Sequence, residues 1–249
     1  MSALILKSRA EGVCELRFNR PEKRNAITFA MYQALAAELK EALADEAVGA
    51  VLLSGAGASF TAGNDLNDFL SGPEFSGTHP VIEVLRTLAT FAKPLVAAVH
   101  GQTVGIGVTM LLHCDLVVAA HSALLTMPFV ALGLVPEAGS SLLVPRLMGQ
   151  QRAAALLLLG EPLTAADAER LGLVNRVVGE DRLHDEARSL ALRLARQPAG
   201  ALRATKELLR GDPLELLARI DAEVREFSTR LKSAEFRARV QALLGKGRS

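Results

Sequence analysis

The sequence predicts a mixed α/β fold that ends in a helical region. In the earlier part of the chain, short apolar segments typical of strands alternate with helical patterns, as in α/β architectures. After about residue 183 the chain becomes rich in Ala, Leu, Arg and Glu, and breaks at residues 197–198 and 211–213 separate three helices or more. With 249 residues, 50% of them apolar, the chain can bury a substantial core. We expect a core domain over residues 1–190 and a helical region over residues 191–249.

The expected elements follow one another in a regular order. They are strands at 4–7 and 13–18, a helix at 29–44, and strands at 50–54, 95–99 and 116–120. A polar turn at 10–12 makes the first two strands a hairpin. A glycine-punctuated loop over residues 100–107 precedes a short helix that ends near residue 113. Residues 71–80 are predicted to form a mobile surface loop.

The helix at 29–44 has both a start signal and a predicted buried face. Thr28 can accept a hydrogen bond from a free N–H of the first turn. Apolar side chains then recur at four-residue spacing: Met31, Leu35, Leu39 and Leu43. We therefore expect this face to pack on the core.

Two glycine-rich loops, at 55–63 and 101–107, each follow a predicted strand. Neither matches the dinucleotide-binding pattern G-x-G-x-x-G, because Phe60 and Thr103 stand where small residues are needed. A nicotinamide dehydrogenase is therefore disfavoured. Residues 105–107 open a helix, whose free N–H groups favour negative charge. These glycines could equally serve only to permit tight turns between strand and helix.

Two carboxylates are candidates for a functional role. Glu137 follows a proline among apolar residues, where desolvation would raise its pKa and suit it to move protons. Taken alone, it is better explained as a helix-start residue stabilised by the helix dipole. Asp65 could be a turn residue, a helix cap or a site residue, and capping is favoured.

Other site classes are disfavoured. His113, Cys114 and Asp115 are adjacent at a helix-to-strand junction, so their side chains point apart and do not favour a metal site. His100 is interpreted as structural, and the absence of a G-x-S-x-G motif argues against a serine hydrolase. Cys14 and Cys114 belong to no spaced set and are expected to be reduced.

Charge and hydropathy suggest a cytoplasmic protein. The formal net charge is +1, from 28 basic and 27 acidic residues, so no global attraction to nucleic acid or a membrane surface is expected. No segment reaches the roughly 18 apolar residues of a membrane span. The final letters, KGRS, do not form a peroxisomal address. The segment at 20–27 carries three cations, which could meet phosphates or could simply be solvated.

Four segments together resemble the crotonase (enoyl-CoA hydratase/isomerase) superfamily in order and spacing. They are NRPEKRNAIT at 19–28, FTAGNDL at 60–66, KPLVAAVHG at 93–101 and GLVPE at 133–137. The resemblance covers nearly the whole chain. It implies a spiral of ββα repeats followed by C-terminal helices, and assembly into a homotrimer or a dimer of trimers through those helices.

The resemblance also implies site roles. The thioester oxygen would be held by the backbone N–H groups of Asn64 and Ile106, which act where negative charge develops. Because the side chain is not the donor, replacing Asn64 by alanine should be mild. The positions implied to contact substrate or CoA are Lys23, Arg24, Ala62, Gly63, Asn64, Asp65, Leu66, Gly105 and Phe129. Coenzyme A enters as part of the substrate, with no cofactor consumed and no metal.

Departures from the hydratase pattern favour one subclass. Hydratases of this superfamily use two glutamates, and those positions align with Thr109 and Phe129, which cannot supply a general base and acid. Glu137 stands where hydratases usually carry glycine. The segments at 63–66, 126–129 and 136–141 resemble the monofunctional Δ3,Δ2-enoyl-CoA isomerases.

This resemblance predicts an isomerase with Glu137 as its catalytic residue. Glu137 would take a proton from C2 of a 3-enoyl-CoA and return it at C4, giving 2-trans-enoyl-CoA in fatty acid or related acyl-CoA degradation. The alternatives are an enoyl-CoA hydratase, another acyl-CoA isomerase of the superfamily, or a non-catalytic acyl-CoA-binding scaffold. An RNA-binding scaffold is disfavoured, because the chain has no tract of arginine and lysine.

Overall fold

A six-stranded sheet forms the centre of the molecule. The structure is a computed structural model that describes residues 3–71, 75, 77 and 79–246. The strand order is β1-β2-β3-β4-β6-β9, with β1 and β2 antiparallel and the other neighbours parallel. The strands are β1 (Ile5–Ala10), β2 (Val13–Phe18), β3 (Ala50–Gly55), β4 (Leu95–Val99), β6 (Leu116–Ala120) and β9 (Arg176–Val178). A second sheet joins β5 (Gln102–Val104), β7 (Leu124–Thr126) and β8 (Leu163–Thr164).

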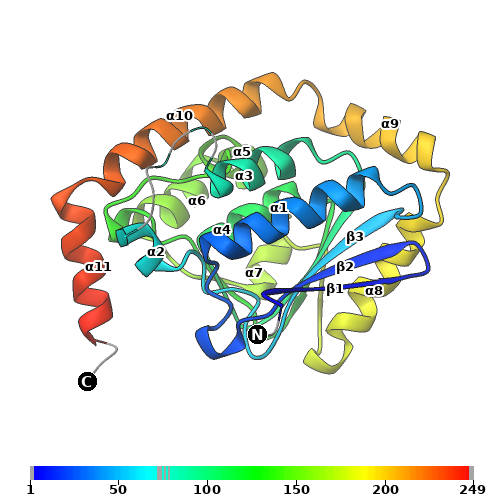
Figure 1. Ribbon diagram of the computed structural model, residues 1–249, viewed down its shortest axis with the longest axis horizontal. Helices are drawn as coiled ribbons and strands as arrows, with labels where there is room; N and C mark the ends of the chain where they lie inside the picture. The colour runs from blue at the N-terminus through cyan, green and yellow to red at the C-terminus, as the bar shows by residue number, and fades with distance from the viewer. Residues whose placement is uncertain (1–2, 72–74, 76, 78, 247–249) are drawn as a thin grey trace.

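Helices surround these sheets. Those before the C-terminal region are α1 (Phe29–Ala44), α2 (Leu66–Ser71), α3 (Pro80–Thr90), α4 (Ile106–Thr109), α5 (Ser140–Met148), α6 (Gln150–Ala154) and α7 (Ala165–Arg170). Short turns of other helix types are η1 (Pro21–Lys23), η2 (Met110–His113), η3 (Val130–Leu132), η4 (Ala155–Leu159) and η5 (Glu180–Arg182). The last four helices are α8 (Leu183–Ala195), α9 (Ala199–Arg210), α10 (Leu214–Leu231) and α11 (Ala234–Lys246). Figure 1 shows α9 and α10 arching over α3 and α5 before α11 turns down the side of the molecule.

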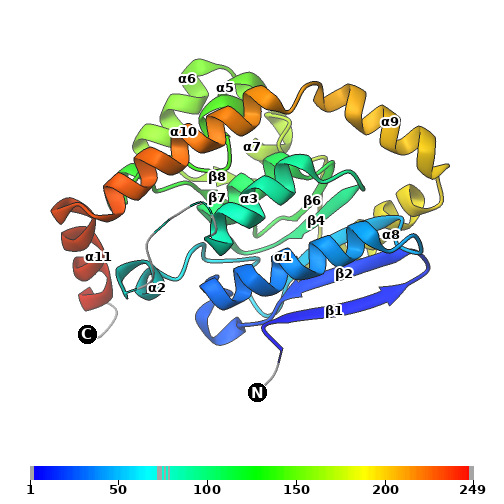
Figure 2. The same cartoon turned by 45° about the horizontal axis from the view of Figure 1, so that its top comes forward.

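The large sheet is buried on both faces. Alternate strand residues point to opposite sides. One set, including Leu16, Leu53 and Ala97, packs with α1 and α3 in the main core. The other set, including Leu52 and Val96, packs against α8, which lies on the opposite side of the sheet from α1 (Figure 2). Helix α8 therefore completes the core rather than extending beyond it.

Helix α1 confirms the prediction at both ends and corrects its buried face. The Thr28 side chain accepts a hydrogen bond from the N–H of Met31, as expected of a cap. Met31, Leu35 and Leu39 are buried, but Leu43 is 38% exposed. A four-residue step overshoots one turn by about 40°, so the fourth member has rotated off the buried face. The face is completed instead by Tyr32, Ala36 and Ala42.

The loop predicted over residues 100–107 is wrong in part, because it contains strand β5. The side chain of His100 is structural, as expected, since its Nε2 lies 2.8 Å from the carbonyl oxygen of Gly57. The helix breaks near 197–198 and 211–213 are confirmed. The loop predicted at 71–80 lies between α2 and α3, but residues 72–74, 76 and 78 are outside the described residues.

Candidate active site

The two glycine-rich loops lie side by side. Thr61 and Thr103 form a parallel bridge, and the Val104 N–H donates to the Thr61 carbonyl at 3.0 Å. Gly63 adopts φ 85°, and a Cβ there would lie 2.8 Å from the carbonyl oxygen of Val104. Only glycine allows both that φ and that close approach. The glycines thus bring residues 62–64 against residues 103–106.

In these loops the backbone N–H groups of Asn64 and Ile106 donate to no backbone carbonyl among the described residues. In the bridge between Ile27 and Asn64, the hydrogen bonds are made by the N–H groups of Ile27 and Asp65, so the N–H of Asn64 points away from Ile27. Ile106 is the first residue of α4, where N–H groups have no partner within the helix. Gly105, with φ 55°, forms the cap that turns the chain into this helix.

The segment at 20–27 supports the first of these loops. Asn25 is fully buried, and its Nδ2 donates to the carbonyl oxygens of Ala56 and Ser59, both at 2.8 Å. Arg20 donates to Asp65 at 2.5 Å, and the Arg20 guanidinium helps hold the pKa of Asp65 below its usual value against the effect of burial. Asp65 also accepts from the N–H of Asn67, which is the expected capping role.

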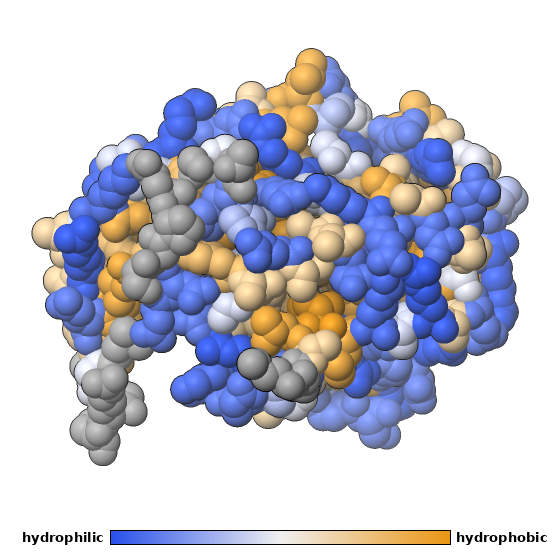
Figure 3. Space-filling view, viewed as in Figure 1, coloured by the Kyte–Doolittle hydropathy of each residue, from blue (hydrophilic) through white to orange (hydrophobic). Residues whose placement is uncertain are grey.

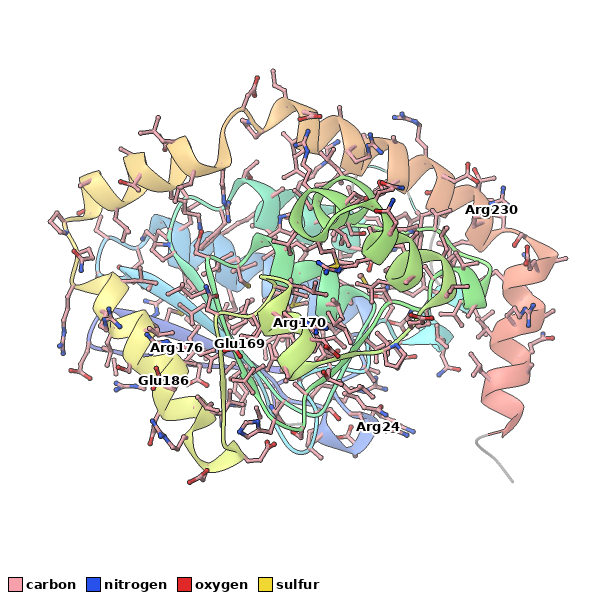
Figure 4. All side chains as sticks on the ribbon, turned by 180° about the vertical axis from the view of Figure 1, so that it is seen from behind. Arg24, Glu169, Arg170, Arg176, Glu186 and Arg230 are labelled. Carbon is pink, nitrogen blue, oxygen red and sulfur yellow. The ribbon has the colours of Figure 1, made fainter. Side chains whose placement is uncertain are left out.

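The two predicted CoA-binding cations are not part of the cavity wall described next. Lys23 and Arg24 are both exposed. Arg24 Nη1 donates to Gln102 Oε1 at 2.9 Å. Figure 4 shows Arg24 on an outer loop with its side chain directed away from the core. The cation that does line the cavity is Arg239 of α11, which sequence reasoning did not single out.

An apolar cavity of about 480 Å³ opens beside the two loops. Five predicted substrate-contacting residues besides Asn64 line it: Ala62, Gly63, Leu66, Gly105 and Phe129. The opposite wall comes from α10 and α11 and includes Phe227, Phe236 and Leu243. Figure 3 shows apolar surface gathered along the inner side of α10 and α11. Asp65 and Glu137 do not line this cavity.

Glu137 is a buried carboxylate that interacts with the Asn64 side chain and is not among the cavity-lining residues. It is 2% exposed, and neither carboxylate oxygen has a hydrogen-bond partner among the residues that the structure describes. Burial, and after it the negative charge of Glu223, raise the pKa of Glu137 to about 8. The Asn64 side chain has a smaller effect and lowers the pKa of Glu137, although the two side chains do not form a hydrogen bond. A carboxylate with this pKa and free lone pairs is suited to proton transfer near neutral pH.

Tyr32 joins α1 to this arrangement, and sequence reasoning missed it. Its buried hydroxyl donates to Asn64 Oδ1. Burial and the charge of Glu137 raise the Tyr32 pKa well above its usual value, so the phenol stays neutral. The contact orients the Asn64 side chain beside Glu137. The signal in the sequence was Tyr32 itself, the single tyrosine, placed on the buried face of the predicted helix.

The structure does not support Glu137 as a helix-start residue. Helix α5 begins at Ser140, and the N–H groups of its cap residue Gly139 and of Ser141 donate to another carboxylate, that of Glu223 on α10. Glu223 lies between Ile220 and Phe227 on the buried face of α10. A charged residue on the apolar face of a helix was the signal that could have identified it.

The residues of the disfavoured metal cluster make structural contacts instead. His113 Nε2 lies 2.8 Å from the Ala138 carbonyl oxygen, while Asp115 accepts from Lys206 at 2.6 Å. Both cysteines are free. Within residues 3–71, 75, 77 and 79–246, no group of three or more His, Cys, Asp or Glu could hold a metal ion. The helices of this described part include none long and apolar enough to cross a membrane.

Comparison with known proteins gives several full-length matches. The chain is 37% identical to 1,2-epoxyphenylacetyl-CoA isomerase of Escherichia coli, over 99% of this chain and 97% of that protein. It is 40% identical to enoyl-CoA delta isomerase 2 of Rattus norvegicus, over 88% of this chain but 57% of that protein. Identity to 2,3-dehydroadipyl-CoA hydratase of Escherichia coli is 35%, over 95% and 93% of the two chains. Names of isomerases and hydratases thus occur at similar identity.

A solved structure and a family model agree with these relatives. OdaA from Pseudomonas aeruginosa superposes with a TM-score of 0.95 at 43% identity, covering 97% of this chain and 99% of that one. The family model described as enoyl-CoA hydratase/isomerase matches residues 8–248. The expected fold is therefore confirmed, with its spiral core and C-terminal helices. The chain belongs to the enoyl-CoA hydratase/isomerase family of the crotonase superfamily.

Proposed function

We propose that the protein is an enoyl-CoA isomerase that converts a 3-enoyl-CoA into 2-trans-enoyl-CoA. The observation that carries the proposal is the state of Glu137, a buried carboxylate without a hydrogen-bond partner, next to a pair of available backbone N–H groups. A single carboxylate of raised pKa is what a proton shuttle between two carbons of one substrate requires.

The positions that would carry the carboxylates of a hydratase favour this subclass. Thr109 is fully buried, and its hydroxyl lies 3.5 Å from the carbonyl of Ile106. Phe129 presents an apolar ring to the cavity. Neither side chain can activate water as a carboxylate does. An apolar wall also excludes the water that would otherwise protonate an intermediate.

In the proposed reaction Glu137 acts first as a base and then as an acid. Glu137 as carboxylate takes a proton from C2, and the electrons move to the thioester oxygen to form a dienolate. That oxygen rests on the N–H groups of Asn64 and Ile106, where losing one donor typically costs about 3 kcal/mol. The carboxylic acid of Glu137 then gives the same proton to C4. The carboxylate is regenerated, and the double bond now joins C2 and C3.

The cavity favours an apolar acyl group. Its walls include aromatic side chains from three helices: Phe69 of α2, Phe227 of α10 and Phe236 of α11. Most of the surface is hydrocarbon, and Arg239 is the cation among its lining residues. We propose that the acyl chain occupies this cavity, that Lys23 and Arg24 contact the CoA portion outside it, and that Asp65 acts by fixing the loop at 62–66.

A panel of substrates tests the proposal. Purified protein is given 3-enoyl-CoA and 2-enoyl-CoA thioesters of graded chain length, and double-bond migration and hydration are followed separately. We expect migration on 3-enoyl-CoA substrates and little hydration of crotonyl-CoA. Rapid hydration with no migration on any chain length would contradict the isomerase assignment. Binding of CoA thioesters with no turnover would indicate a scaffold.

A hydratase is the second candidate, because relatives named as hydratases match at similar identity. It would need a carboxylate other than Glu137 to hold water. Glu223 is the carboxylate whose charge acts on Glu137, but both of its oxygens accept backbone hydrogen bonds. A hydratase that used Glu223 would therefore have to break the hydrogen bonds from Gly139 and Ser141.

We also propose that the helical region at 191–249 assembles the protein into a homotrimer or a dimer of trimers. Leu208 and Leu209 on α9 are 85% and 84% exposed, and Leu214 at the start of α10 is exposed as well. Large apolar side chains grouped on a surface favour a protein interface. Light scattering at micromolar concentration should report three or six chains, and a stable monomer would contradict the assembly.

A further inference from the structure

The turn that carries Glu137 has an unusual backbone. Ala138 has φ 62° and Gly139 has φ 73°, so two consecutive residues lie in the left-handed region. A side chain at position 139 would collide with Leu216 of α10, since a Cβ there would lie 2.3 Å from Leu216 Cδ1. A non-glycine residue in this region persists only where its surroundings hold it. The contacts around residues 137–141 must therefore supply that restraint.

Glu223 of α10 supplies two of these contacts. Its Oε2 accepts from the N–H of Gly139 at 2.6 Å, and its Oε1 accepts from the N–H of Ser141 at 2.9 Å. On the other side of the turn, His113 Nε2 meets the Ala138 carbonyl at 2.8 Å. Hydrogen bonds thus hold the turn from both η2 and α10, which are far apart in the sequence.

A role in capping α5 alone does not explain the position of Glu223. A cap is normally provided by a short polar residue next to the helix, at little cost. Here the cap is a carboxylate on a helix more than 80 residues away, with Glu223 only 6% exposed. Burying a charge is costly unless it is well paired. The charge of this carboxylate also acts on Glu137, whose pKa it raises.

We propose that Glu223 is a positioning residue for Glu137, holding the turn at 137–141 so that the Glu137 carboxylate is directed toward the Asn64 and Ile106 loops. The proposal rests on the isomerase function proposed above. It also gives α10 a role in the site beyond assembly. Removing the charge should therefore change both where Glu137 points and how readily it ionises.

The charges around the pair are few. Glu223 raises the pKa of Glu137, after burial. Burial also raises the pKa of Glu223 above its usual value, although its hydrogen bonds from Ser141 and Gly139 and the charge of Arg219 act to lower it. Tyr32 faces Glu137 from α1 and stays neutral, because burial raises its pKa. His113 faces the turn from η2 and is also neutral, since burial lowers its pKa to about 4. Among the described groups, Glu223 is the charged one that acts on Glu137.

The test replaces Glu223 by glutamine and compares it with Glu226→Gln. Glu226 lies on the same helix and is paired with Arg230 on the surface, so it controls for the substitution itself. Glu223→Gln loses the charge and can accept from only one of the two N–H groups. We expect kcat to fall about 10- to 100-fold with KM nearly unchanged. The acid limb of the kcat/KM profile should move to lower pH, because a negative charge near Glu137 is gone.

A titration that needs no substrate separates this proposal from the proposed function. The ionisation of Glu137 is followed by infrared difference spectroscopy in wild type and Glu223→Gln, with Glu137→Gln used to assign the band. We expect the Glu137 transition to move to lower pH in Glu223→Gln and to stay in place in Glu226→Gln. If wild type fails to isomerise any substrate, the function is wrong, and this titration still decides whether Glu223 acts on Glu137.

Glu223→Asp keeps the test decisive if the glutamine variant does not fold. The shorter side chain keeps the charge but cannot reach both N–H groups, so we expect kcat to fall while the Glu137 transition stays near its wild-type pH. Circular dichroism establishes that each variant is folded. Wild-type kcat and an unmoved Glu137 transition in folded Glu223→Gln would overturn the proposal. Wild-type kcat in folded Glu223→Asp would overturn it equally.

Discussion

The two halves of the site are built in different ways. The paired N–H groups of Asn64 and Ile106 are placed by loops that pack against each other through glycine and backbone hydrogen bonds. The turn bearing Glu137 is held by side chains, His113 on one side and Glu223 on the other. The half proposed to stabilise the anion is thus determined locally, by the positions of glycines. The half proposed to transfer the proton depends on contacts between distant parts of the chain.

The largest effect should come from Glu137 itself. Glu137→Gln keeps the shape and removes the base, so we expect kcat for 3-enoyl-CoA to fall on the order of 10³-fold or more, with acyl-CoA binding retained. Stopped-flow absorbance and calorimetric binding measure the two quantities. Glu46→Gln, an exposed glutamate changed in the same way, should leave both unchanged. Wild-type turnover by Glu137→Gln would remove the isomerase mechanism.

The role of the paired backbone N–H groups can be tested without changing a carboxylate. Asn64→Pro deletes one N–H, and we expect kcat to fall at least about 100-fold while the oligomer stays intact. Asn64→Ala keeps the N–H and removes the side chain that contacts Tyr32 and acts on Glu137, so the fall in kcat should be about tenfold at most. Steady-state kinetics and light scattering measure both. Equal losses in the two variants would mean that the backbone is not the donor.

The pH dependence should report the burial of Glu137. Its pKa is raised from 4.5 to about 8, so the free enzyme lacks the base below that pH, and kcat/KM should rise about tenfold per pH unit before levelling near 8. The unfolded state, with the ordinary pKa, binds fewer protons between these values. Stability should therefore fall as pH rises across this window. Urea unfolding should show that Glu137→Gln lacks this slope, whereas a profile flat from pH 5 to about 9 would contradict the raised pKa.

The smallest effect on kcat should come from Tyr32, which links the Asn64 loop to the surroundings of Glu137. Tyr32→Phe removes the hydroxyl that donates to Asn64 Oδ1. A net hydrogen bond of about 1 kcal/mol corresponds to a loss in kcat of a fewfold. We expect KM to change little. Steady-state kinetics measure both, and a loss as large as that of Asn64→Pro would give Tyr32 a direct part in the chemistry.

The sequence predicted those features whose causes are local. The Thr28 cap, the glycine at position 63 and the breaks before α9 and α10 all act on neighbouring residues, and the structure places them as expected. The apolar surroundings of Glu137 and its raised pKa were predicted from its neighbours in the sequence, and the structure confirms both, whereas the distant residues that hold its turn were not predicted. Glu223 and Phe227 reach the site through tertiary packing, which no spacing along the chain specifies. The predicted burial of Leu43 was wrong because residues spaced four apart rotate progressively around a helix.

The closing of the site by α10 and α11 has a consequence for synthesis. The cavity wall includes Phe227, Phe236 and Leu243, and the grip on the Glu137 turn comes from Glu223. These residues leave the ribosome after the sheet and α8. The main core also includes Ile220, Phe227, Phe236 and Val240 of the same two helices. The nascent chain therefore holds an incomplete core until α10 and α11 dock, and the cavity wall and the contacts that hold the Glu137 turn form in that same step.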